Sequence, residues 1–291
     1  MEAHTPRKRF GQNFLTDTGI IDKIVRSIAP KPSDNLVEIG PGQGAITIPL
    51  LALCPAFNVI ELDRDLVARL TTLQEQYPGL TINQGDALAF DFSALALPSE
   101  ASENKKSLRV LGNLPYNIST PLIFHLLSFS DIIKDMHFML QKEVVERMAA
   151  SEGSKTYGRL SVMVQYACKV TNLFPVPPEC FNPRPKVDSA IVRLEPYETF
   201  PYPADNVELL KKLVTTCFQH RRKTLRNNLR ALVPNEVIEA LDSGPSKKDS
   251  DKENETQEFS IDMSRRPETL SVIEYVTLAN ILQRQYAEKV L

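Results

Sequence analysis

The chain has 291 residues, of which 42% are hydrophobic and 24% charged, and its formal net charge is -2. These values are ordinary for a globular protein with one large or two modest domains. No apolar run approaches the roughly 18 residues that a membrane helix needs, so we expect no membrane partner. The first ten residues lack the apolar core of a signal peptide, and we therefore expect a cytoplasmic protein.

The cysteines and histidines do not form a metal-binding pattern. The four histidines are scattered, and no two cysteines form a Cys-x-x-Cys pair, so neither a zinc site nor any other metal is indicated. Buried free thiols in a reducing compartment are the expected state of the four cysteines, which are Cys54, Cys168, Cys180 and Cys217.

Up to about residue 150, short apolar runs alternate with amphipathic segments. The first is a helical stripe over residues 18–29, with Asp17 as its N-cap. Buried strands are predicted at 36–39, 57–62, 80–83, 109–111 and 137–140, and helices at 64–74, 121–129 and 142–150. Strands that alternate with helices favour a parallel sheet with helices on both faces.

The pattern changes after residue 150. A helix is predicted at 160–168 and strands at 169–176 and 190–194, which favours an antiparallel pair at the edge of the sheet. Beyond residue 195 only helices are predicted, at 207–218, 224–232 and 270–282. A stretch rich in Pro and Tyr at 196–203 separates the two patterns. We therefore expect an α/β domain over residues 1–197 and a small all-α domain over residues 198–291.

Two polar stretches interrupt these elements. Residues 243–257 are charged and contain no aromatic or aliphatic side chain, which predicts a disordered loop between C-terminal helices. Residues 99–107 form a shorter polar insertion.

A glycine-rich loop, Gly40-Pro41-Gly42-Gln43-Gly44, follows the first predicted strand and precedes a helix. Glycines allow a tight turn and a close approach of the backbone to a ligand, which predicts a nucleotide-like cofactor. Glu61 ends the next strand, where its carboxylate can accept hydrogen bonds from two ribose hydroxyls. The alternative is a structural turn beside a surface acid.

Gly85-Asp86-Ala87 closes the third of these strands. An aspartate at the carboxyl end of a strand lies at the edge of the sheet where ligands bind, and Asp86 could accept a hydrogen bond from an adenine amine. The alternative is that Asp86 caps the next turn.

Asn113-Leu114-Pro115-Tyr116 closes the fourth strand and is the most informative stretch of the chain. An aromatic amine is a poor nucleophile, because its lone pair is conjugated with the ring. The side-chain oxygen of Asn113 and the carbonyl of Leu114 can hold the two amine hydrogens, so that the lone pair faces a methyl donor. Pro115 favours an extended Leu114, and Tyr116 offers a face on which a flipped base stacks. An ordinary turn is the alternative.

The order of these motifs resembles that of the rRNA adenine dimethyltransferases, and especially of the bacterial enzymes that modify 16S rRNA. The motifs are Gln12-Asn13-Phe14-Leu15, residues 38–44, Glu61, Gly85-Asp86-Ala87, residues 113–116 and Phe181-x-Pro183-Arg184-Pro185-Lys186-Val187-Asp188-Ser189. The resemblance implies a Rossmann-like methyltransferase domain, a small helical C-terminal domain and S-adenosylmethionine as cofactor. It also implies dimethylation of the N6 amines of two adjacent adenosines in the 3'-terminal hairpin loop of 16S rRNA, in the 30S subunit.

The resemblance also implies roles for single residues. The cofactor would be held by Asn13, Leu15, Gly40, Gly42, Glu61, Asp86, Ala87 and Asn113, with catalysis by Asn113, Leu114 and Tyr116. Phe181 and Tyr116 would enclose the target base, although a Phe before a Pro-rich turn is by itself more typical of a core anchor.

The low net charge argues mildly against binding to nucleic acid, but charge distribution matters more. A predicted helix around residues 220–230 concentrates basic side chains suited to RNA phosphates: Arg221, Arg222, Lys223, Arg226 and Arg230. A solvated basic face is the alternative. Arg7-Lys8-Arg9 forms a second, smaller cluster, and the acidic stretch at 249–258 offsets both in the total.

Two other functions remain open from the sequence. The first is dimethylation of 23S rRNA, as in enzymes that confer macrolide resistance, although their C-terminal domains are usually shorter. The second is a ribosome-assembly factor that has lost turnover. A DNA adenine methyltransferase would usually carry a proline where Leu114 stands. No helix suggests oligomerisation, and we expect a monomer.

Overall fold

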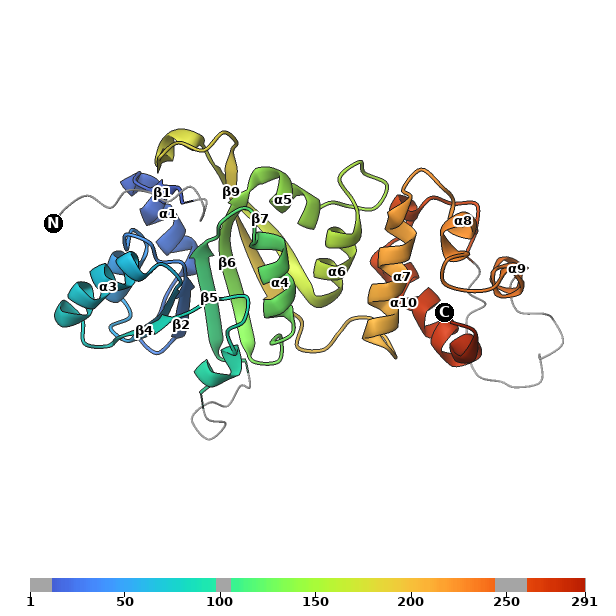
Figure 1. Ribbon diagram of the computed structural model, residues 1–291, viewed down its shortest axis with the longest axis horizontal. Helices are drawn as coiled ribbons and strands as arrows, with labels where there is room; N and C mark the ends of the chain where they lie inside the picture. The colour runs from blue at the N-terminus through green and yellow to red at the C-terminus, as the bar shows by residue number, and fades with distance from the viewer. Residues whose placement is uncertain (1–11, 98–105, 244–260, 291) are drawn as a thin grey trace. The chain divides into compact units, whose positions relative to one another are not determined.

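The computed structural model describes residues 12–97, 106–243 and 261–290 (Figure 1). Within them the chain forms two compact units. The first combines the residues up to Glu146 with Ala167–Glu198, and the second combines Arg147–Tyr166 with the residues from Thr199 onward. The predicted stretch 243–257 lies outside the described residues except for Ser243, and the clusters at 7–9 and most of 99–107 also lie outside them.

The first unit is built on a seven-stranded sheet in the order β4-β3-β2-β5-β6-β9-β7. Five strands are parallel, namely β4 (Leu80–Gln84), β3 (Phe57–Glu61), β2 (Asn35–Ile39), β5 (Leu108–Asn113) and β6 (Ile133–Gln141). At the far edge β9 (Ser189–Pro196) pairs antiparallel with both β6 and β7 (Cys168–Val176). The predicted mostly parallel sheet with an antiparallel edge is confirmed.

A second, two-stranded sheet was not predicted. In it β1 (Phe14–Leu15) pairs antiparallel with β8 (Phe181–Asn182), so that two motifs far apart in the sequence lie side by side. A further backbone hydrogen bond of 2.8 Å runs from the amide of Thr16 to the carbonyl of Cys180. Strands of two residues carry too little periodicity to be recognised in a sequence.

Among the described residues, four α-helices lie within the first unit, and a fifth begins there and ends in the second unit. They are α1 (Thr18–Ile28), α2 (Thr47–Leu51), α3 (Arg64–Gln76), α4 (Ser119–Leu127) and α5 (Lys142–Met148). Asp17 caps α1 as predicted, because its side chain accepts a hydrogen bond of 2.8 Å from the amide of Ile20. The helix ends where Ala29 adopts a left-handed conformation with φ of 48°.

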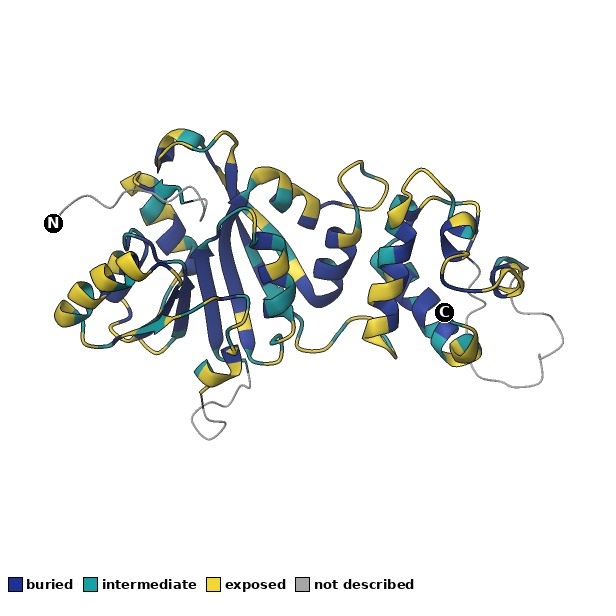
Figure 2. Cartoon of the chain, viewed as in Figure 1, coloured by how far each residue is buried: buried dark blue, intermediate teal, exposed yellow. Residues whose placement is uncertain are grey.

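Both faces of the sheet are covered (Figure 2). Apolar side chains of α1, α2 and α3, including Ile24, Leu50 and Leu70, share one buried cluster with alternate residues of the strands. Successive strand residues point to opposite faces. Val110 and Phe138 do not belong to this cluster, but both are buried. The second face of the sheet is therefore covered as well, and Figure 1 shows α4 crossing it.

A buried ionic network ties the amino end of β5 to its neighbours. The Nε atom of Arg109 donates to Asp135 at 3.0 and 3.1 Å, Nη1 to Asp34 at 2.5 Å and Nη2 to the carbonyl of Ile28 at 2.6 Å. Burial acts to raise the pKa of Asp135, but hydrogen bonds from His137 and Arg109 outweigh it and lower that pKa. The carboxylate is therefore ionised in the folded protein.

The second unit is helical. It contains most of α6 (Arg159–Ala167), together with α7 (Val207–Gln219), α8 (Leu225–Leu229), α9 (Asn235–Ser243) and α10 (Val272–Tyr286). Helix α9 was not predicted. The helix predicted around residues 220–230 is wrong as a continuous element, because α7 ends at Gln219 and a turn at 220–223 precedes α8.

The single domain boundary predicted at 197/198 needs correction, because Arg147–Tyr166 belongs to the helical unit. Arg221 donates to the carbonyls of Lys155 and Tyr157 at 3.0 and 2.8 Å. The ring of Tyr157 meets that of Phe218 edge-on, with centroids 6.3 Å apart. These contacts join segments that are more than 60 residues apart in the sequence, and no local sequence pattern predicts them.

Several expectations concern the chemistry of the chain as a whole. All four cysteines are buried and unbridged, as predicted, and burial raises the pKa of Cys168 and Cys217 to about 12. No helix among the described residues is both long and apolar enough to cross a membrane. In the same residues no group of three or more His, Cys, Asp or Glu side chains could hold a metal ion.

Replacement of Arg109 by alanine is expected to lower the free energy of unfolding by about 3 to 5 kcal/mol, because it removes the cation that neutralises the largely buried carboxylates of Asp34 and Asp135. Chemical unfolding followed by circular dichroism measures the change. Arg26→Ala is the matched control, since its ion pair with Asp22 is exposed and should contribute less than about 1 kcal/mol. Equal effects of the two substitutions would contradict a structural role for the network.

Candidate functional site

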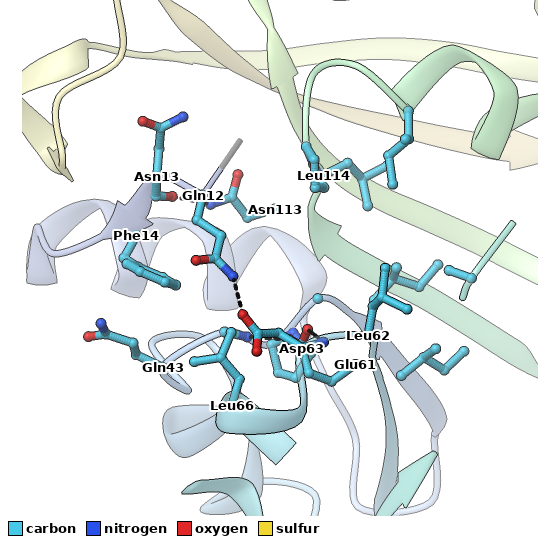
Figure 3. Close-up of a pocket in the computed structure, with 18 of the residues that line it drawn as sticks. Gln12, Asn13, Phe14, Gln43, Glu61, Leu62, Asp63, Leu66, Asn113 and Leu114 are labelled. Carbon is cyan, nitrogen blue, oxygen red and sulfur yellow. Dashed lines mark hydrogen bonds between the residues drawn. The ribbon is translucent and has the colours of Figure 1, made fainter. Parts of the chain in front are cut away.

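A cavity of about 290 Å³ opens at the carboxyl edge of the sheet in the first unit. Its wall comes from the segment around β1 and from the loops that follow β2, β3, β4 and β5 (Figure 3). Ligands bind at this edge in open α/β sheets. The structure brings every predicted cofactor and catalytic residue to its lining: Asn13, Leu15, Gly40, Gly42, Glu61, Asp86, Ala87, Asn113, Leu114 and Tyr116.

The glycine loop forms one wall through its backbone. Gly40, Gly42 and Gly44 all have a positive φ, of 66°, 59° and 85°. A side chain at Gly42 would be strained by this φ, and its Cβ would lie 3.1 Å from the ring of Phe14. The N-terminal segment therefore packs directly on the loop, and only glycine fits between them.

Glu61 is held by backbone donors at the end of β3. It accepts hydrogen bonds from the amide of Gly42 at 3.3 Å and from the amide of Asp63 at 2.9 Å. Burial raises the pKa of Glu61, and these backbone donors partly offset the effect by favouring the ionised form. The carboxylate is thus fixed in place and keeps lone pairs that can accept further donors.

Glu38 is a second buried acid beside the glycine loop. It is 2% exposed and accepts a hydrogen bond of 2.7 Å from the hydroxyl of Thr47, the first residue of α2. Burial raises its pKa to about 7, the Thr47 hydrogen bond acts against this shift, and the charge of Glu61 adds to it. No role was predicted for Glu38, because only the fold brings Thr47 and Glu61 close to it.

A contact between side chains fastens the N-terminal segment across the cavity. The Nε2 atom of Gln12 donates to Asp63 at 3.1 Å (Figure 3). The other carboxylate oxygen of Asp63 accepts from the amide of Asp65 and caps α3. Neither Gln12 nor Asp63 was predicted as a site residue, although the position of Asp63 before a predicted helix marks it as an N-cap.

Asn113 ends β5 and is oriented by the N-terminal segment. Its Nδ2 atom donates to the carbonyl of Asn13 at 2.9 Å. This contact turns the Oδ1 atom away from Asn13, and Oδ1 has no hydrogen-bond partner among the described residues. The amide group therefore has one orientation, with its acceptor left available to a ligand.

The next residue supplies a second acceptor. The amide of Leu114 donates to the carbonyl of Met139 at 3.2 Å, and its side chain is 1% exposed, so the residue is anchored to β6. Its own carbonyl accepts no hydrogen bond within the described part of the chain. Two acceptors on consecutive residues are consistent with a site for an amine that has two hydrogens.

Tyr116 lines the cavity with a half-buried side chain. Its hydroxyl shares a hydrogen bond of 2.7 Å with the hydroxyl of Ser189. Burial raises the pKa of Tyr116, and the hydrogen bond with Ser189 acts against this shift. The phenol is therefore neutral at physiological pH.

Asp86 caps a turn and also lies on the lining of the cavity. Its Oδ1 atom accepts a hydrogen bond of 2.9 Å from the amide of Leu88, and this contact caps the turn after β4. The residue is also exposed on the lining of the cavity. The capped turn uses one oxygen, and the other can accept a hydrogen bond from a ligand.

Phe181 does not lie on the cavity lining as the resemblance implied. It is 5% exposed and belongs to the core cluster, where its strand pairs with that of Leu15. In its observed position Phe181 does not reach a base in the cavity, and the alternative of a core anchor fits better.

The predicted basic cluster in the second unit divides into two groups. Arg221 donates to backbone carbonyls and Arg226 forms an ion pair with Asp242, so both have structural partners. Three others are exposed and form no ion pair with described residues: Arg222, Lys223 and Arg230.

The family described as "Ribosomal RNA adenine dimethylase" matches residues 3–266 of the chain. The chain belongs to this family. A "Ribosomal RNA small subunit methyltransferase A" from Saccharophagus degradans is 60% identical over 97% of this chain and 96% of its own length. The protein of that name from Chromohalobacter salexigens is 56% identical over 96% of this chain and 92% of its own.

Solved structures agree with this membership. A dimethyladenosine transferase from Plasmodium falciparum is 29% identical and superposes with a TM-score of 0.72, covering 95% of this chain and 99% of that chain. The 23S rRNA methyltransferase ErmE, at 20% identity and a TM-score of 0.66, covers 94% of this chain and all of its own, and shows a similar fold. The Rossmann-like methyltransferase fold and the enzyme class predicted from the sequence are confirmed.

Glu38 is expected to make stability depend on pH. Its pKa is 4.5 in the reference state and about 7 in the folded protein, so between these values the folded protein keeps a proton that the unfolded chain has lost. Stability therefore falls as pH rises through this window. Glu38→Gln cannot titrate and does not show this fall in stability. The stability of the variant relative to wild type should therefore increase from pH 4.5 to 7 by up to ~3 kcal/mol.

Thermal unfolding of wild type and Glu38→Gln across pH 4 to 8 measures this difference. Glu75→Gln, at an exposed position in α3, is the control and should show no such trend. A constant difference between Glu38→Gln and wild type over the whole range would contradict the assignment.

Proposed function

We propose that this family member transfers methyl groups from S-adenosylmethionine to the N6 amines of two adjacent adenosines in the 3'-terminal hairpin loop of 16S rRNA. The observation that carries the proposal is a pair of acceptors, Oδ1 of Asn113 and the carbonyl of Leu114, that accept no hydrogen bond from the described residues. They share one cavity with Tyr116 and the glycine loop. Relatives at 52 to 60% identity that are named small subunit methyltransferases support the choice of target.

The cavity residues fit the cofactor. Gly40 and Gly42 present only backbone to the cavity, Glu61 holds a carboxylate in place, and Leu62 is 50% exposed at the lining, where an apolar ring can pack. S-adenosylmethionine supplies an electrophilic methyl group when it is bound. In this proposal Glu61 accepts from the ribose hydroxyls and Asp86 from the adenine amine, while Gly40 lies against the amino-acid portion.

The remaining predicted cofactor contacts come from the N-terminal segment and its neighbours. Asn13 and Leu15 would cover the cofactor, since both line the cavity and β1 is held by its pairing with β8. Gly42 and Ala87 would contribute close backbone contacts, because neither presents a large side chain to the cavity.

Catalysis would depend on positioning and electrostatics. Oδ1 of Asn113 and the carbonyl of Leu114 accept the two hydrogens of the adenine amine, which directs its lone pair at the methyl group. The carbon–sulfur bond of the methyl donor would break as the new carbon–nitrogen bond forms. The amine becomes cationic in this step, both acceptors and the face of the Tyr116 ring favour that charge, and the product would then lose one proton to solvent. The chain needs no covalent intermediate for this reaction.

The helical unit would contact RNA through Arg222, Lys223 and Arg230, the exposed part of the basic cluster. Lys and Arg side chains that neutralise phosphates make binding strongly dependent on salt. Arg221 and Arg226 would act indirectly, because their side chains stabilise the unit itself. We further propose that the substrate is the 30S subunit or its precursor, that the enzyme acts as a monomer in the cytoplasm, and that it serves small-subunit biogenesis.

The two other functions have weaker support. The 23S rRNA methyltransferase is only 20% identical, which speaks for the fold and not for the target. An assembly factor without turnover would not need two free acceptors beside an intact glycine loop. The relatives named for the small subunit favour the 16S target over both alternatives.

Wild-type protein is expected to transfer labelled methyl groups to adenosine in 30S particles that lack the modification. Asn113→Ala should lower turnover by about 10²-fold or more, because one of the two acceptors is lost. Asn113→Asp keeps an acceptor but loses the donor to Asn13, and should retain intermediate activity. Asn172→Ala, at an exposed position in β7, is the control. No label in adenosine with wild type would refute the proposed function.

Simultaneous replacement of Arg222, Lys223 and Arg230 by alanine should weaken RNA binding and reduce its dependence on salt, by a slope of about 0.7 to 0.9 for each lost phosphate contact. Filter binding at several salt concentrations measures both. The control is a second triple alanine variant with the same change in charge. It replaces three cations that already form ion pairs with acids, namely Lys211, Arg284 and Lys289. Equal slopes for the two variants would contradict a specific RNA surface.

A further inference from the structure

The hydroxyl of Tyr116 is held by a residue outside the predicted catalytic set. Ser189 lies 73 residues further along the chain, and the two hydroxyl oxygens are 2.7 Å apart. Ser189 closes the motif that begins at Phe181, and neither the motif nor the family resemblance gave it a role.

Ser189 is a rigid anchor. It is fully buried and is the first residue of β9, where it pairs with Gln141 of β6 on one side and with Val176 of β7 on the other. The preceding carbonyl, that of Asp188, accepts a hydrogen bond of 2.9 Å from the amide of Lys142. A side chain fixed between two paired strands has little freedom to follow movements of Tyr116.

Tyr116 is also fixed at its backbone. Its carbonyl accepts a hydrogen bond of 3.1 Å from the hydroxyl of Ser119, the first residue of α4. The carbonyl of the preceding Pro115 accepts one of 3.2 Å from Ile118. With the backbone and the hydroxyl both held, only one orientation of the intervening ring is compatible with both contacts.

We propose that Ser189 is a positioning residue for methyl transfer, because its buried hydroxyl fixes the ring of Tyr116 in the orientation on which the target adenine stacks. The proposal rests on the proposed function, since it assumes that Tyr116 meets a base. A ring that is free to rotate must be ordered each time a base enters, and this ordering reduces the fraction of bound base in the reactive orientation.

A purely structural role for Ser189 predicts a different outcome. If the hydroxyl only contributes to the packing at the start of β9, its loss would lower stability and activity whether or not residue 116 carries a hydroxyl. If Ser189 acts through Tyr116, its loss should matter only while that hydroxyl is present. A double-mutant cycle separates these cases.

The experiment compares wild type, Ser189→Ala, Tyr116→Phe and the double variant in methyl transfer to 30S particles that lack the modification. Ser189→Ala is expected to lower kcat about tenfold, the factor that corresponds to one neutral hydrogen bond. Its KM for S-adenosylmethionine should be unchanged, because Ser189 does not line the cavity. In the Tyr116→Phe background the same substitution should have no further effect on kcat.

Ser189→Thr retains a hydroxyl and should recover part of the lost kcat. The matched control is Ser161→Ala, which removes another fully buried serine hydroxyl, one that donates to the carbonyl of Arg147 in the helical unit. It should change kcat by the same factor in both backgrounds.

Two results would overturn the proposal while leaving the proposed function intact. The first is an unchanged kcat for Ser189→Ala, and the second is an equal loss of kcat with and without the Tyr116 hydroxyl. An inactive wild-type enzyme would instead refute the proposed function and this inference together, so the two failures are distinguishable.

Discussion

The parallel pairing of β2 with β5 is the constraint on which the site depends. It brings two segments to one edge of the sheet, the glycine loop after Ile39 and the Asn113–Tyr116 segment that begins at the last residue of β5. The strands approach so closely that a Cβ on Gly112 would lie 2.4 Å from the carbonyl oxygen of Ile39. Only glycine permits this separation, and the acceptors next to it therefore have a fixed distance from the loop.

The two ends of strand β5 differ in their surroundings. The amino end belongs to a buried ionic network, and the carboxyl end lies at the cavity. The amino end carries Arg109, whose ion pairs are largely buried. The carboxyl end carries Asn113, whose side-chain oxygen accepts no hydrogen bond within the described parts of the chain. At that same end Glu38 and Glu61 are buried with raised pKa values, so their negative charge is costly without a compensating partner. A cationic ligand in the cavity would reduce this cost, which links the electrostatics of the site to the charge of the cofactor.

Much of the fold could be predicted because the spacing of apolar residues indicates helices and strands. Helix α1 and strands β2, β3 and β4 were expected within two residues of their observed ends. Three of the errors share one physical cause. The allocation of Arg147–Tyr166 to the helical unit, the core position of Phe181 and the internal ion pair of Arg226 each depend on a partner outside the local stretch of sequence.

By itself, the sequence determined the strand–helix alternation, the order of the motifs and the chemistry of the residues at the strand ends, since these depend on neighbours a few positions away. Only the tertiary structure decided which atoms remain available. Asn113 is oriented by a residue 100 positions away and Tyr116 by one 73 positions away. Such contacts form only when the strands have paired, and periodicity in the sequence carries no record of them.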